Sequence, residues 1–69
     1  MEIEISNVEY QEERKRIAVT VSYGEEQPTE EWDRVRVTIF IDWTDSFEDL
    51  KRKALERANA FLLHCASSH

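Results

Sequence analysis

The residues of this chain best suited to metal or nucleophilic chemistry lie together near its C-terminal end. His64, Cys65 and His69 fall within one short segment, and imidazole and thiolate groups are preferred zinc ligands. A structural zinc site takes about four ligands, and the chain has no other Cys or His. Only two copies together would reach that count, so we expect no metal site.

Catalysis by these side chains finds little support in the sequence. His64 has no Asp or Glu within one helical turn to orient it, and Cys65 lies on the apolar side of a helical pattern, where a thiol is usually inert. Phosphate-binding loops need several Gly residues, and this chain has one. We therefore expect no catalytic residue, no cofactor and no enzymatic activity.

The strongest pattern is the alternation over residues 34–43. Odd positions are apolar and even positions are polar or charged, with Phe40 as the exception. Side chains of a strand alternate between its two faces, so this pattern predicts a strand with one buried and one wet face. Strands are expected at about residues 2–10, 15–23 and 33–43.

The first strand contains a change of phase, because Ile5 and Val8 have opposite parity. A β-bulge between them would bring both side chains to one face. The short polar connection that follows predicts a hairpin. With this bulge we expect Val8 to pair with Ile17, and in the next hairpin we expect Thr20 to lie near Arg36.

A helix is predicted at about residues 46–66, with Asp45 or Ser46 as its N-cap. Its apolar stripe is predicted to contain Phe47, Leu50, Ala54, Ala58, Phe61, Leu62 and Cys65. Such a helix is roughly 30 Å long, similar to about nine extended residues, so it could cover the sheet lengthwise. We expect one α+β domain over residues 1–69: a three-stranded antiparallel β-meander followed by one C-terminal helix packed on one sheet face (β-β-β-α).

Composition sets broad limits on the function. Fifteen acidic and nine basic residues give a net charge of −6. This charge argues against a protein that binds nucleic acid over its whole surface. The single cysteine suits a reducing compartment, and no apolar run is long enough to span a bilayer. We therefore expect a cytoplasmic protein that does not insert into membranes.

Several apolar side chains lack an obvious partner within this fold. Trp32 lies in an acidic loop, Phe40 on the outer sheet face and Leu63 off the helix stripe. The third strand is a long, regular edge strand, and pairing with its own copy would cover it. We expect a small non-enzymatic protein-interaction module, homodimeric through the third-strand edge, the helix or both, that also binds an unidentified protein. Candidate interface residues are Trp32, Val35, Val37, Ile39, Phe40 and Leu63.

Two alternatives remain open at this stage. A nucleic-acid-binding accessory protein could use the outer sheet face, because RNA-binding sheets stack bases on exposed aromatic side chains. Its candidate residues are Arg16, Arg34, Arg36 and Phe40. One aromatic side chain is few for this purpose, and neighbouring glutamates would repel phosphate. In the second alternative, the acidic surface around Glu30 and Glu31 binds a basic partner.

Overall fold

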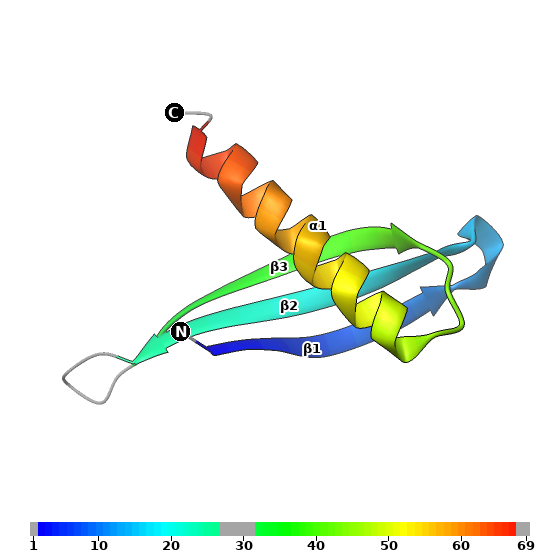
Figure 1. Cartoon of the computed structure of the whole chain (residues 1–69), viewed down its shortest axis with the longest axis horizontal. Coiled ribbons are helices and arrows are strands. Elements are labelled where there is room, and N and C mark those ends of the chain that lie inside the picture. The colour runs from blue at the N-terminus through cyan, green and yellow to red at the C-terminus, as the bar shows by residue number, and fades with distance from the viewer. Residues whose placement is uncertain (1, 27–31, 68–69) are drawn as a thin grey trace.

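The structure is a computed structural model that describes residues 2–26 and 32–67. The chain forms, in order, β1 (Glu2–Gln11), the short 3-10 helix η1 (Glu12–Arg14), β2 (Arg16–Glu26), β3 (Trp32–Asp42) and α1 (Phe47–Ser67) (Figure 1). The strands form one antiparallel sheet in the order β1-β2-β3, and α1 packs on one of its faces. The predicted β-β-β-α fold is confirmed.

The β-bulge predicted in β1 is present, because the β1–β2 register shifts between Ile5 and Asn7. The predicted partners were wrong by two positions in both hairpins. Val8 lies opposite Val19, not Ile17, and Thr20 lies opposite Thr38, not Arg36. Because an even shift preserves the side-chain alternation, each residue still occupies the face that its parity predicts.

The geometry of the two turns explains these shifts. The first hairpin turns through η1 and Lys15, which has a left-handed φ of 51° and donates its N–H to the Glu12 carbonyl at 3.2 Å. Lys15 therefore belongs to the turn, although the sequence pattern placed it in the second strand. In the second hairpin, β2 continues past Gly24 and pairs as far as Glu26. The loop to β3 therefore begins after Glu26, whereas the predicted second strand ended at residue 23.

The core lies between α1 and the facing side of β2 and β3. Its centre is formed by fully buried residues of β2 and of α1, including Leu50, Ala54 and Ala58. The two alanines allow the helix backbone to approach the sheet closely, because they have the smallest side chains that still define a helical face. The buried core residues are Ile17, Val19, Val21, Tyr23, Val37, Ile39, Ile41, Leu50, Ala54 and Ala58.

The helix begins with a side-chain cap. The Ser46 hydroxyl accepts a hydrogen bond from the Asp49 backbone N–H at 3.3 Å, which satisfies one of the free donors of the first turn. Ser46 is therefore the N-cap, as one of the two predicted alternatives. A second bond, from the Ser46 N–H to the Thr44 hydroxyl at 3.2 Å, fixes the residues that lead into the helix.

The helix crosses the sheet obliquely, and its C-terminal turns lie beyond β3 in Figure 1. The prediction of lengthwise coverage was therefore wrong. Phe47 is 65% exposed, Phe61 is 49% exposed and Cys65 is exposed, although all three were assigned to the buried stripe. The buried residues of α1 lie between Leu50 and Ala58, so the stripe has the predicted phase, but its C-terminal part stays uncovered where the helix leaves the sheet.

Candidate interaction surfaces

The outer edge of β3 carries backbone groups that no described strand pairs with. The Trp43 N–H donates to the Lys15 carbonyl at 3.2 Å, which makes these residues a hydrogen-bonded pair. Hydrogen-bonded and non-bonded pairs alternate along an antiparallel ladder. Odd-numbered residues of β3 therefore bond to β2, and even-numbered residues direct their N–H and C=O groups outward. We call this the β3 edge, formed by the backbones of Arg34, Arg36, Thr38, Phe40 and Asp42.

An apolar groove lies between the sheet and the C-terminal half of α1. We call it the Val35–Leu63 groove; its volume is about 500 Å³, and it is lined by Tyr23, Val35, Asn59, Leu62 and Leu63. Val35 is 49% exposed and Leu63 is 71% exposed. Because β3 supplies Val35, the groove opens directly beside the β3 edge.

A hydrogen bond joins two of the residues that line this groove. The Tyr23 hydroxyl donates to Asn59 Oδ1 at 2.9 Å, and this bond joins β2 to α1. Burial raises the pKa of the Tyr23 hydroxyl above its usual value, because the buried environment disfavours the phenolate. Tyr23 is therefore a neutral donor over the ordinary pH range, and it holds the helix at the point where the C-terminal turns leave the sheet.

The structure separates the predicted interface residues into groups. The side chains of Val35, Phe40 and Leu63 are exposed, as a contact surface requires. Val37 and Ile39 are only 6% and 5% exposed, so their side chains belong to the core. Trp32 belongs to β3 through its backbone, but its side chain lies outside the part that the structure describes, and Glu30 and Glu31 lie outside it entirely.

The face of the sheet opposite α1 carries the four predicted nucleic-acid residues, with Arg16 and Phe40 near one end of β3 and Arg34 near the other. Arg16, Arg34, Arg36 and Phe40 all lie on this face. The guanidinium carbon of Arg16 lies 4.0 Å from the centroid of the Phe40 ring, which is a close cation–π contact. The Arg16 Nε also donates to Gln11 Oε1 at 2.6 Å, so its side chain is held in place over the ring.

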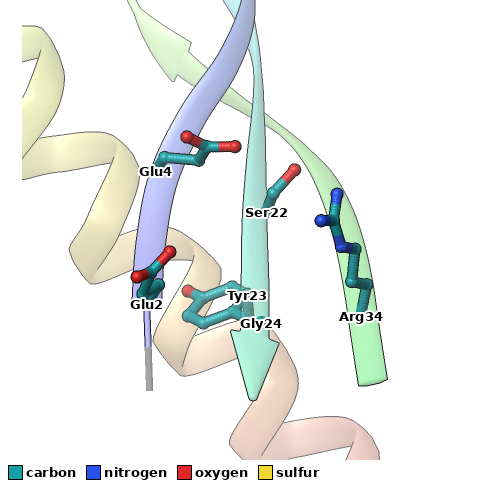
Figure 2. Close-up of a pocket in the computed structure, with 6 residues that line it drawn as sticks. All are labelled: Glu2, Glu4, Ser22, Tyr23, Gly24 and Arg34. Atoms are coloured by element: carbon teal, nitrogen blue, oxygen red, sulfur yellow. The ribbon is translucent and has the colours of Figure 1, made fainter. Parts of the chain in front are cut away.

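Carboxylates share this face with the arginines. Figure 2 shows the end of the face near the start of β1, where Glu2 and Glu4 lie on one side of Ser22 and Arg34 lies on the other. The hollow between these side chains measures about 50 Å³, which is enough for a water molecule and too little for a substrate.

Metal-binding clusters and membrane-spanning helices are both absent from the described residues. Within residues 2–26 and 32–67, no group of three or more His, Cys, Asp or Glu side chains is placed to hold a metal ion. His64 and Cys65 are both exposed on the last turns of α1. In the same part of the chain, no helix has the length and apolar character needed to cross a membrane.

Comparisons of the chain with models of known families, with curated proteins and with solved structures found no match.

Sequence reasoning missed the Val35–Leu63 groove, because Tyr23 and Asn59 carry no signal of their proximity. The run Ala60-Phe61-Leu62-Leu63, which is apolar around most of the helix, was the one available indication.

Proposed function

We propose that the protein is a small, non-enzymatic protein-interaction module that forms a homodimer through the β3 edge and the adjoining C-terminal half of α1. The observation that carries this proposal is the position of Val35, which belongs to the edge strand and also lines the Val35–Leu63 groove. An open row of backbone groups and an exposed apolar surface therefore meet at one side of the fold. A partner at this side would cover both.

Each part of this surface has a physical reason to be covered. An exposed edge strand that is long and regular is a template for pairing with another strand, and β3 spans 11 residues. Full burial of a Leu or Phe side chain contributes about 1.5–3 kcal/mol, and Leu63 and Phe61 are 71% and 49% exposed. Leu63 lines the Val35–Leu63 groove, whereas Phe61 lies two positions earlier in α1 and therefore faces a different side of the helix.

The same features support a non-enzymatic role in the cytoplasm. Two hollows of about 490 and 630 Å³ beside described titratable side chains are open surface depressions, whereas the Val35–Leu63 groove is lined mainly by apolar groups. A groove of that kind suits binding better than bond breaking. The exposed thiol of Cys65 fits a reducing compartment, where it would stay unoxidised.

Nucleic-acid binding through the outer sheet face is the second candidate, favoured by the grouping of three arginines and Phe40 on one face. Two features weaken it. The Phe40 ring already contacts Arg16, so a base would have to displace this contact before stacking. Glu2, Glu4 and Asp42 on the same face oppose phosphate. Binding of single-stranded homopolymers at low salt, lost in Arg34→Glu/Arg36→Glu, would support this candidate and not the first.

Sedimentation velocity over a range of concentrations tests the homodimer. We expect the wild-type chain to sediment as a dimer at micromolar concentration, and we expect Leu63→Glu to shift it to monomer, because the charge would be buried at the contact. Phe47→Glu is the matched control: it changes an exposed aromatic residue at the other end of α1 and should leave the dimer intact. A wild-type chain that stays monomeric at every concentration would contradict the proposal.

A further inference from the structure

We infer that two copies pair their β3 edges antiparallel about a two-fold axis at Thr38, so that Arg34 of each copy lies opposite Asp42 of the partner subunit. This inference rests on the proposed homodimer and adds its register. The resulting sheet would have six strands, with both helices on the same face.

The backbone restricts the possible registers. Only even-numbered residues of β3 direct their N–H and C=O groups outward, as shown by the bond between Trp43 and Lys15. A symmetric antiparallel pair can form hydrogen bonds only when even-numbered residues face even-numbered residues. The axis must then pass through one residue of β3 that faces its own copy. The available axis positions in the centre of β3 are Arg36, Val37, Thr38, Ile39 and Phe40.

The charges favour Thr38 among these positions. Arg34 and Asp42 lie four positions before and four positions after Thr38, so an axis there sets each opposite the other and forms two ion pairs. Within one copy the two residues are separated by eight strand positions, or roughly 26 Å, and cannot meet. Neither forms an ion pair or a side-chain hydrogen bond with another described residue. Arg16 of β2 lies opposite Asp42 in the same copy, but its guanidinium group contacts Phe40 and Gln11 instead. The same axis sets Arg36 opposite Phe40 of the partner subunit.

The other axis positions form fewer favourable charge contacts between the two copies. An axis at Arg36 sets two guanidinium groups opposite each other, which is repulsive. An axis at Val37 sets Arg34 opposite Phe40 of the partner subunit, and the partner subunit then supplies no cation to Asp42, which keeps only Arg16 of its own copy opposite it.

Positions further along β3 shorten the ladder. An axis at Ile39 allows Asp42 to face Arg36 of the partner subunit but places Arg34 beyond the end of β3. An axis at Phe40 places both Arg34 and Arg36 beyond it, because β3 ends at Asp42.

Pairing about Thr38 also accounts for the exposure of Val35. On the face that carries α1, Val35 would lie opposite Ile41 of the partner subunit, and both side chains are apolar. The turns of α1 that lie beyond β3 (Figure 1) would then extend over the partner's sheet. The Val35–Leu63 groove, open in one copy, would become part of the interface.

Disulfide trapping with single cysteines reports the register directly. Arg36→Cys, Thr38→Cys and Phe40→Cys are each made in a Cys65→Ser background and oxidised under mild conditions. Directly opposed residues in a hydrogen-bonded pair have Cα atoms about 5.5 Å apart, within disulfide range. Residues two positions from the axis are separated from their own copies by about four strand positions, or roughly 13 Å. We therefore expect rapid cross-linking of Thr38→Cys and at least about tenfold slower cross-linking of the other two variants.

The other outcomes separate the register from the homodimer. Preferential cross-linking at Arg36→Cys or Phe40→Cys, or equal cross-linking at two neighbouring sites, would overturn the Thr38 axis and leave edge pairing in place. A dimer in sedimentation with no cross-link at any of the three sites would overturn pairing at this edge. A monomer in sedimentation would overturn both this inference and the proposed function.

Discussion

The Tyr23 hydroxyl donates a hydrogen bond of 2.9 Å to Asn59 Oδ1. This bond joins the central strand to the fourth turn of a helix that otherwise contacts the sheet through small or aliphatic side chains. It lies at the position where α1 begins to leave the sheet, and both residues line the Val35–Leu63 groove. The bond therefore contributes to stability and also fixes the angle at which the C-terminal turns are presented.

Removal of the hydroxyl in Tyr23→Phe tests the contribution to stability. A typical intramolecular hydrogen bond contributes about 0.5–1.5 kcal/mol net, and the unpaired Asn59 carbonyl can still reach water because Asn59 is exposed. We expect the free energy of unfolding to fall by about 1 kcal/mol in urea titration. Tyr10→Phe is the control, because Tyr10 is 52% exposed, and its change should stay within about 0.5 kcal/mol. Equal effects of the two substitutions would contradict this role.

The raised pKa of Tyr23 predicts a loss of stability in alkaline solution. The unfolded chain loses the phenol proton near pH 10.0, whereas the folded chain keeps it to higher pH. The unfolded state therefore binds fewer protons in this window, and its stability relative to the folded state increases as pH rises. The contribution of Tyr23 should be complete below about pH 10 and should decline above it. Urea titrations at pH 8 and above pH 10 should show a smaller difference between wild type and Tyr23→Phe at the higher pH; a constant difference would contradict the shift.

The close approach of α1 to the sheet depends on its two buried alanines. Ala58 is 0% exposed, so Ala58→Leu has no room and should lower the free energy of unfolding by about 1–3 kcal/mol through overpacking. Ala60→Leu adds the same side chain at an exposed position of the same helix and should change it by less than about 0.5 kcal/mol. Thermal or urea unfolding of both variants measures these changes in the free energy of unfolding. Similar stability of the two variants would mean that the helix does not approach the sheet as described.

The contact between Arg16 and Phe40 should appear as a coupling energy between these residues. A double-mutant cycle with Arg16→Ala and Phe40→Ala is expected to give about 0.5–1 kcal/mol, the usual size for an exposed cation–π pair. The cycle is best measured in the Leu63→Glu background, where a partner cannot contribute. Gln11→Ala removes the other bond of Arg16 and should leave the coupling in place. A coupling of zero would leave Phe40 free to stack on a base and would favour the nucleic-acid candidate.

The fold class was predictable because alternation has a period of two residues and the helix a period of 3.6. Parity alone assigned Arg16, Arg36 and Phe40 to the outer face, and a mismatch in parity located the bulge. Register was not predictable, because a shift of two positions leaves every side chain on the same face. The conformation of Lys15, which a lysine adopts rarely, distinguishes the true pairing from the predicted one in the first hairpin, and the continuation of β2 to Glu26 does so in the second.

The exposed ends of α1 were not predictable for a different reason. Periodicity identifies the face that Phe47, Ala58 and Phe61 share, but it carries no information about the angle at which a helix crosses a sheet. That angle depends on tertiary contacts such as the bond between Tyr23 and Asn59. The Val35–Leu63 groove is a consequence of the angle, so it could be found only from the structure.

Amide hydrogen exchange along β3 tests the central claim most directly. The Val37 and Ile39 N–H groups point toward β2 and should be protected whether or not a dimer forms, so they are the internal control. At concentrations where the dimer is complete, we predict that the Thr38 N–H is protected to a similar degree, because it bonds to the partner's edge. Fast exchange at Thr38 beside slow exchange at Val37 and Ile39 would show that the β3 edge is open to water and would contradict the account.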